Sequence, residues 1–301
     1  MRVMGAITTG TVAPLWLSDP DQIDGYTLTG RLGSGGTATV YLAHSPEHGD
    51  VALKVMHPDL PDAAVAVRTE FQLMRRAGSR HVVRVFDHGD SGDGAYLAMA
   101  YLPRYAPMSA LRSGMDIPTL WRLAYATARA IAATHAADVI HCDVKPSNLL
   151  THRGDVRLID FGIARDMYAQ VEAGDPMIRC SRGWAAPEQL SKGPLTPAVD
   201  VFAWGCLVAY LADGVHPFAS SSLPEWVLRV RTSEPDIYHV PAGLEPLVRA
   251  ALSRNPSDRP TAWELASACR DNAVWRARDG RERRSAPVEV LTGELSAVAA
   301  G

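Results

Sequence analysis

The sequence predicts an α+β fold with two lobes, a strand-rich N-terminal lobe and a helix-rich C-terminal lobe. Apolar residues alternate in short runs up to about residue 102, whereas after Pro103 they recur every three to four residues; these patterns indicate strands and helices, respectively. The chain has 301 residues, 47% of them hydrophobic, which is enough for a large buried core. We therefore divide it into a flexible leader rich in Gly, Thr, Pro and Asp (1–23), the two lobes (24–102 and 103–270) and a polar tail (271–301).

Charge and composition argue against several classes of protein. The 30 Lys and Arg residues against 33 Asp and Glu give a net charge of −3, which offers no support for nucleic-acid binding. The longest uncharged run in the middle of the chain is Val201–Ala212, far shorter than the about 20 residues of a membrane helix. We therefore expect no membrane span and a cytoplasmic location; the oligomeric state stays open. Four widely spaced cysteines predict reduced thiols rather than disulfides or a zinc site: Cys142, Cys180, Cys206 and Cys269.

The first elements of the N-terminal lobe are three strands. Residues 26–32 and 40–42 alternate around the glycine turn at residues 33–36, which predicts a hairpin. The third strand is Val51–Met56, and its period of two places Ala52 and Lys54 on the same face.

A helix follows Asp62 and ends near Gly78. Its stripe of Val67, Glu70, Phe71 and Met74 contains a carboxylate among apolar residues, which is costly unless the carboxylate has a partner. We expect Glu70 to pair with Lys54. Two further short strands are predicted at residues 81–87 and 95–101.

The C-terminal lobe begins with a helix opened by Pro118. A polar segment at 141–148 and a hairpin around Gly154 follow, and the apolar run at 200–212 predicts a helix buried on all sides. Three more helical patterns occupy residues 223–230, 244–253 and 262–269.

Several polar residues suit phosphate chemistry. Gly33 and Gly35 allow backbone N–H groups to approach phosphates, although an ordinary hairpin turn explains them equally well. Only three of the 30 basic residues are lysines (Lys54, Lys145 and Lys192), so each lysine suggests a specific role.

The segment from Asp143 to Asn148 carries the strongest local signal. A carboxylate such as Asp143 can accept the proton of a hydroxyl nucleophile, and Lys145 can supply a cation close by. Asn148 and Asp160 are oxygen donors of the kind Mg²⁺ prefers, and Gly162 would permit the turn that directs Asp160 inward. A solvated polar loop is the alternative for each piece taken alone.

Over residues 26–270 the chain resembles the eukaryotic-like serine/threonine protein kinases of bacteria. The motifs of that family occur in its order. They are the glycine loop Leu32–Val40, the strand Val51–Lys54, Glu70, the catalytic loop His141–Asn148, Asp160–Gly162, Ala186–Glu188, Asp200 with Trp204–Gly205, and Arg259–Pro260, whose arginine pairs with Glu188 in the family.

This resemblance implies a protein-kinase-like bilobal fold, ATP and Mg²⁺ as cofactors, and proteins with serine or threonine hydroxyls as substrates. Asp143 and Lys145 would be catalytic, Asn148 and Asp160 would hold the metal, and Lys54 with Glu70 would serve the phosphates. The residues implied to bind the nucleotide are Leu32, Gly33, Gly35, Val40, Ala52, Lys54, Glu70, Met99 (as gatekeeper), Leu102 (in the hinge) and Leu150.

The sequence departs from the family pattern at a few positions. Ala38 replaces the third glycine, Trp184 replaces a tyrosine, and Cys142 replaces the catalytic-loop arginine that receives an activation-segment phosphate in relatives. Between residues 163 and 185 the only hydroxyl side chains are Tyr168 and Ser181. We therefore expect a kinase that is not controlled by phosphorylation of this segment.

Two alternative functions stay open beside the active protein kinase, together with one alternative that concerns two of its cysteines. The chain could be a pseudokinase scaffold that only binds nucleotide, although its core polar positions are intact. It could be a small-molecule kinase related to the antibiotic phosphotransferases, against which the glycine loop, Ala186–Glu188 and Arg259 argue. A redox switch formed by Cys142 and Cys180 competes with the simpler reading of two packed thiols.

Overall fold

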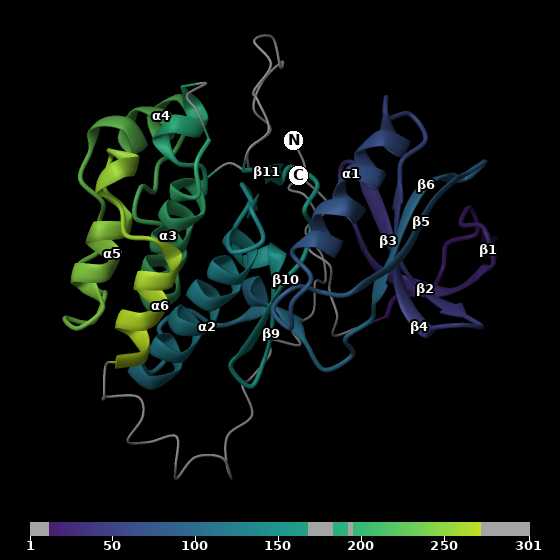
Figure 1. Ribbon diagram of the computed structural model, residues 1–301, viewed down its shortest axis with the longest axis horizontal. Helices are drawn as coiled ribbons and strands as arrows, with labels where there is room; N and C mark the ends of the chain where they lie inside the picture. The colour runs from purple at the N-terminus through teal and green to yellow at the C-terminus, as the bar shows by residue number, and fades with distance from the viewer. Residues whose placement is uncertain (1–11, 168–182, 192–194, 272–301) are drawn as a thin grey trace, which may run out of the picture.

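The computed structural model describes residues 12–167, 183–191 and 195–271, and it has the two lobes that the sequence predicts (Figure 1). The N-terminal lobe is one antiparallel sheet of six strands in the order β1-β2-β3-β4-β6-β5, with one helix, α1 (Ala63–Arg76), packed against β5 and β6. The strands are β1 (Gln22–Ile23), β2 (Tyr26–Ser34), β3 (Ala38–Ser45), β4 (Gly49–Met56), β5 (Val85–Ser91) and β6 (Gly94–Ala100).

Both faces of this sheet are buried. One face joins the main core that continues into the C-terminal lobe, and it includes Leu32, Val40 and Ala52. The other face has its own apolar cluster around Leu28, Tyr41 and Leu53, against which Leu15 packs. Period-two alternation in β2, β3 and β4 therefore supplies two cores from the same strands.

The chain before β2 is where the structure differs most from the sequence prediction. Ala13 forms two backbone hydrogen bonds with Arg31, and Gln22–Ile23 pairs with β2. The expectation of a free leader is therefore wrong for residues 12–23, because they lie along the sheet and cover part of it. Residues 1–11 are outside the described part of the chain.

Two N-terminal predictions hold with shifted boundaries. Helix α1 buries Val67, Glu70 and Met74 as the stripe predicts, but Asp62 has a left-handed backbone (φ 58°) rather than the extended conformation of a side-chain cap. The strand expected at 81–87 runs from Val85 to Ser91 instead. The predicted start of this strand, residues 81–83, instead forms backbone hydrogen bonds with Leu158 in the C-terminal lobe.

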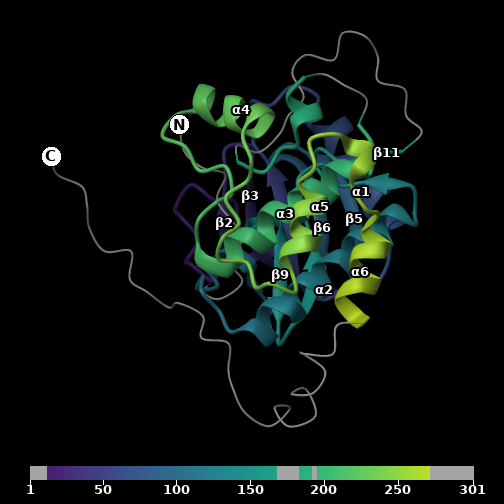
Figure 2. The same ribbon diagram turned by 90° about the vertical axis from the view of Figure 1, so that its left-hand side faces the viewer.

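The C-terminal lobe is built around α3 (Ala198–Asp213), which is buried on nearly all sides as predicted. Helix α2 (Ile117–His135) packs against α3 and against α6 (Ala262–Asp271), and α5 (Glu245–Ala251) packs against α3 (Figures 1 and 2). The Trp204 indole N–H donates to the Ala124 carbonyl at 2.9 Å and so joins α3 to α2. The remaining elements are α4 (Leu223–Thr232), β7 (Ala106–Pro107), β8 (Val139–Ile140), β9 (Leu149–His152), β10 (Asp155–Leu158) and β11 (Arg165–Asp166), with short 3₁₀ helices at Met108–Ala110, Pro146–Asn148, Pro187–Leu190 and Pro256–Asp258.

Of the helices in the described part of the chain, none is both long enough and apolar enough to span a membrane.

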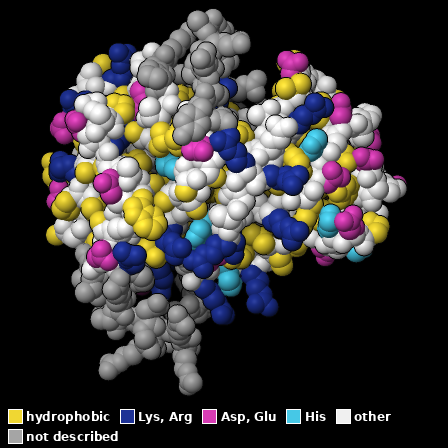
Figure 3. All heavy atoms as spheres, viewed as in Figure 1, with side chains coloured by type: hydrophobic (Ala, Val, Ile, Leu, Met, Phe, Trp, Pro, Cys, Tyr) yellow, Lys and Arg dark blue, Asp and Glu magenta, His cyan; other side chains and the backbone are white. Residues whose placement is uncertain are grey.

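Positively charged side chains are concentrated in one region of the surface. Figure 3 shows basic side chains gathered on the face in view. Burial lowers the pKa of His81, and the nearby Arg129, Arg80 and Arg157 lower it further.

Candidate active site

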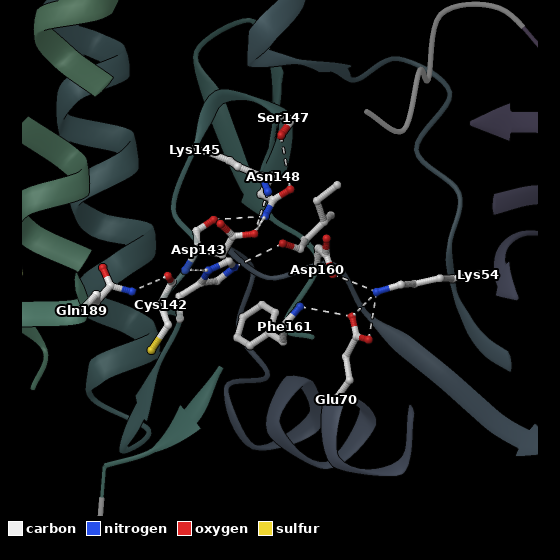
Figure 4. A network of polar contacts seen from close by, with 12 residues as sticks. Lys54, Glu70, Cys142, Asp143, Lys145, Ser147, Asn148, Asp160, Phe161 and Gln189 are labelled. Atoms are coloured by element: carbon white, nitrogen blue, oxygen red, sulfur yellow. Dashed lines mark hydrogen bonds and ion pairs between the residues drawn. The ribbon is translucent and has the colours of Figure 1, made fainter. Parts of the chain in front are cut away.

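The two lobes meet at Lys54, which lies between two carboxylates (Figure 4). Lys54 lies on strand β4, and its Nζ is 2.9 Å from both oxygens of Glu70 on α1 and 2.8 Å from Asp160 Oδ1 in the C-terminal lobe. The backbone N–H of Phe161 also donates to Glu70, at 3.2 Å. The partner that a carboxylate in an apolar stripe requires is therefore Lys54, as the sequence predicts.

Burial and charge act against each other in this triad. Burial disfavours the ammonium of Lys54, but Asp160 and Glu70 outweigh it and raise the pKa of Lys54 above its ordinary value. Burial also opposes ionisation of Asp160, yet Lys54 lowers the pKa of Asp160 to about 2. Burial raises the pKa of Glu70, because Lys54 offsets only part of that cost. Asp160 is therefore the carboxylate that stays ionised and suited to a cation.

The segment 141–148 is held in place by the first turn of α3. Asp200 is buried there and accepts hydrogen bonds at 2.8 Å from the backbone N–H groups of His141 and Cys142, and its other neighbour at 2.8 Å is His135 Nε2. Cys142 adopts a positive φ of 63°. The buried carboxylate thus stabilises a loop backbone that a non-glycine residue seldom adopts.

Asp143 and its neighbours form a compact polar group in this loop. Its Oδ2 lies 2.7 Å from Lys145 Nζ and 2.9 Å from Asn148 Nδ2, which also donates to the Asp143 carbonyl at 3.0 Å. Asp143 Oδ1 is buried and has no hydrogen-bond partner among the residues that the structure describes. One carboxylate oxygen is therefore fixed by the protein, while the other is left to accept a proton or a hydroxyl.

Asn148 and Asp160 fit a magnesium site by their chemistry. Asn148 uses its amide N–H group to hold Asp143, which leaves its Oδ1 as an acceptor that Ser147 Oγ approaches at 3.5 Å. Gly162 acts differently from the prediction: the left-handed backbone occurs at Asp160 itself (φ 63°), and a Cβ at residue 162 would lie 3.2 Å from Asp160 Oδ1. Glycine therefore leaves room beside the carboxylate.

Most of the predicted nucleotide-binding side chains come from strands β2, β3, β4 and β6 of the N-terminal lobe, whereas Leu150 comes from β9 of the C-terminal lobe. The turn after β2 is closed by a hydrogen bond from Gly35 N to the Ala38 carbonyl (2.8 Å), and a Cβ at Gly36 would meet open space. The structure brings the predicted apolar residues into one core cluster, with Leu102 partly buried against it: Leu32, Val40, Ala52, Met99 and Leu150.

Cys142 has a neutral, buried side chain. Burial, and then the nearby Asp200, raise the pKa of its thiol well above the ordinary value, so the thiolate needed for redox chemistry is disfavoured. Cys180, its candidate partner in a redox switch, is outside the described residues. The Cys142 carbonyl accepts from Gln189 Nε2 at 3.0 Å, and Gln189 Oε1 accepts from Ala186 N at 2.9 Å.

Gln189 was not among the predicted site residues, although it connects the catalytic loop to the chain after the activation segment. Its position directly after Ala186–Glu188 was the only available signal. By contrast, the pair of Glu188 and Arg259 was expected. Arg259 donates to both oxygens of Glu188, at 2.6 and 3.0 Å, with its own side chain fully buried.

Trp184 packs against the C-terminal lobe, edge-on to Tyr210 and His216. The expectations for Tyr168 and Ser181 concern residues outside the described part, as do those for the tail after residue 271.

Comparison with known proteins places this site in a family. The family model described as "Protein kinase domain" matches residues 26–269. The probable serine/threonine-protein kinase PkwA of Thermomonospora curvata is 33% identical over 259 residues, which is 84% of this chain and 35% of the relative. The serine/threonine-protein kinase AfsK of Streptomyces coelicolor is 31% identical (82% of this chain, 32% of the relative), and PknL of Mycobacterium tuberculosis is 32% identical (78% and 62%).

The chain thus spans about a third of the length of PkwA and AfsK. The resemblance to bacterial serine/threonine protein kinases, inferred from the motifs, is confirmed by these relatives. Because the family model covers most of the chain, from the first strand of the glycine hairpin to the last helix, the chain belongs to the protein kinase family.

Proposed function

We propose that the chain transfers the γ-phosphate of ATP, bound with Mg²⁺, to serine or threonine hydroxyls of protein substrates. The observation that carries the proposal is Lys54, held at 2.9 Å by Glu70 and at 2.8 Å by Asp160. This arrangement supports phosphate binding because two carboxylates fix a buried ammonium at the point where the two lobes meet. It also brings the two halves of the site together.

The N-terminal lobe would bind the nucleotide. Gly33 and Gly35 have no Cβ, so phosphate oxygens would be able to come close to the backbone of the turn, and Lys54 would neutralise phosphate charge. The adenine would lie among the apolar residues of the shared cluster, with Leu102 at its edge: Leu32, Val40, Ala52, Met99 and Leu150.

Asn148 and Asp160 would hold Mg²⁺, which when bound neutralises charge on the phosphates. Lys54 keeps Asp160 ionised, so that this carboxylate is ready to act as a ligand near neutral pH. Asn148 contributes an amide oxygen while its N–H group positions Asp143. One asparagine therefore serves both the metal and the proposed base.

Asp143 would orient the substrate hydroxyl and accept its proton. Lys145 and Asn148 fix Oδ2, so Oδ1 is the oxygen that supports contact with the hydroxyl. Lys145, two residues after Asp143, matches the serine/threonine pattern of the family, and the relatives are named for that specificity.

The proposal includes control that does not depend on phosphorylation of the activation segment. Cys142 carries no positive charge with which to receive a phosphate, and Gln189 already links the catalytic loop to the residues after that segment. Phosphatase-treated enzyme should keep its activity. Loss of activity, with the removed phosphate mapped to residues 163–185, would refute this part of the proposal.

The free thiols Cys142, Cys206 and Cys269 support a reducing, cytoplasmic location.

Transfer of radiolabelled phosphate from ATP with Mg²⁺ to a generic basic protein tests the reaction. Asp143→Asn and Lys54→Met should each lower kcat/KM at least about 100-fold, since each removes a group that acts in the transition state. Asp90→Asn, an exposed position on β5, is the matched control and should transfer normally. Undiminished transfer by Asp143→Asn would overturn the assignment, and nucleotide binding without transfer by the parent chain would indicate a pseudokinase.

A further inference from the structure

Residues 12–23, here called the N-terminal strap, are attached to β2 at both ends. Ala13 and Arg31 exchange two backbone hydrogen bonds, of 2.9 and 2.8 Å. Further along, the Asp21 carbonyl accepts from Leu28 N at 2.9 Å, and Gln22–Ile23 forms β1, at the edge of the sheet beside β2 (Figure 1). The strap therefore follows the strand that leads into the glycine loop.

Gly30 makes this close approach possible. A Cβ at residue 30 would overlap Val12 Cγ1 and lie 3.0 Å from the Ala13 carbonyl oxygen. A larger residue would require the Val12 side chain to turn away and the Ala13 carbonyl to shift, so glycine gives the strap room beside β2.

A buried ion pair joins the strap to β2. Asp19 accepts two hydrogen bonds from Arg31 Nη1, at 2.6 and 2.8 Å, together with bonds from the Tyr41 hydroxyl (2.9 Å) and the Trp16 backbone N–H (2.7 Å). The Trp16 ring lies over the guanidinium, 3.7 Å from its carbon. Burial opposes the charge on Asp19, but these donors outweigh it and lower the pKa of Asp19.

From Arg31 the contacts continue to both sides of the glycine loop. Arg31 Nη2 donates to Thr39 Oγ1 at 3.5 Å, and Thr39 Oγ1 lies 3.2 Å from Ser34 Oγ and 3.4 Å from His57 Nε2. Ser34 and Thr39 are the register pair that closes the loop. The register also shifts between Arg31 and Gly33, so Arg31 anchors the strand at the base of a bulge that begins the loop.

We propose that the strap positions the glycine loop for nucleotide binding, with Asp19 and Arg31 as the positioning residues. The inference rests on the proposed function and adds to it an element outside the family motifs. A glycine loop must be ordered over the phosphates when nucleotide binds, and ordering a flexible backbone costs free energy. Because the strap fixes β2 directly before Gly33, it lowers the free energy that is needed to order the loop when nucleotide binds. Neither Asp19 nor Arg31 needs to contact the nucleotide.

Asp19→Asn in the full chain is the principal test, because it removes the charge but keeps the size of the side chain. We expect Kd and KM for ATP to rise about 5- to 20-fold, in the range of typical coupling between sites, while kcat changes less than about 2-fold. Amide hydrogen exchange at residues 33–38 should become faster. Asp21→Asn, an exposed residue of the same strap, is the matched control and should leave all these quantities unchanged.

Two further variants keep the proposal testable if Asp19→Asn does not fold. Tyr41→Phe removes one hydrogen bond to Asp19 and should raise Kd for ATP by a smaller factor. Gly30→Ala displaces the strap without changing any charge, and it should act in the same direction. Because coupling is reciprocal, ATP with Mg²⁺ should also slow hydrogen exchange of the strap in the parent chain.

The proposal is overturned if Asp19→Asn lowers the melting temperature but leaves Kd for ATP and loop exchange as in the parent chain. It is also overturned if kcat falls while Kd for ATP does not change. Of these readouts, Kd for ATP and amide exchange in the loop need only nucleotide binding. A parent chain that binds ATP without transferring phosphate would therefore refute the proposed function while the strap could still be tested.

Discussion

Acidification should destabilise the C-terminal lobe through His216. This imidazole follows α3, where its Nδ1 accepts a hydrogen bond from Phe218 N at 3.1 Å and its ring meets the edge of Trp184. Burial lowers the pKa of His216 from 6.5 to about 4. The stability that neutral His216 contributes is therefore fully present above pH 6.5 and is lost as the pH falls toward 4. One pKa unit corresponds to about 1.4 kcal/mol, so the loss amounts to roughly 3 kcal/mol of unfolding free energy.

Urea unfolding at a series of pH values between 7 and 4 measures this loss. His216→Asn keeps an acceptor for Phe218 N but does not titrate in this range, so its deficit in stability relative to the parent chain should shrink by roughly 3 kcal/mol on going from pH 7 to pH 4. His44→Asn, at a histidine with a 57% exposed side chain, is the matched control and should follow the parent curve. Parallel curves for His216→Asn and the parent chain would refute the reasoning.

Three further outcomes follow from the C-terminal lobe. Arg259→Met should cost about 3–5 kcal/mol in urea unfolding because it leaves Glu188 buried without its partner, and a loss below about 1 kcal/mol would contradict this. Gly205→Ala should lower the free energy of unfolding by about 1–3 kcal/mol, because the new Cβ would lie 2.9 Å from Leu252. In the double variant with Leu252→Ala the two effects should be non-additive, and strict additivity would show that this contact is not the cause. Asp200→Asn should lower kcat at least about 10-fold with little change in KM for ATP, because it loosens the loop that carries the proposed base; an unchanged kcat would contradict this.

Local pattern predicted most of the fold and of the candidate site. A carboxylate in an apolar helical stripe predicted the partner of Lys54, and the uninterrupted apolar run predicted the burial of α3. Each of these signals lies within the helix that carries the buried residues. The physical reason is that burial of one helix face, and the cost of an unpaired charge, are decided locally.

The features that sequence reasoning missed depend on pairs of residues that no local pattern marks. The strap looked like a flexible leader because its polar composition gave no sign that Asp19 meets Arg31 on a neighbouring strand. The start of β5 was misplaced because residues 81–83 satisfy their backbone hydrogen bonds with Leu158 in β10. Gln189 has no local pattern at all, since its partner Cys142 is 47 residues away.

Asp200 holds one part of the site from within the C-terminal lobe, whereas another part depends on contacts between the two lobes. Asp143, Lys145 and Asn148 are bonded to one another, and Asp200 fixes their loop from within the same lobe. Among the described residues of this site, the contacts that cross to the other lobe are those of Lys54 with Asp160 and of Phe161 N with Glu70. A hinge opening between the lobes would therefore break these two contacts and leave the proposed base with its hydrogen-bond partners, ready for the next nucleotide.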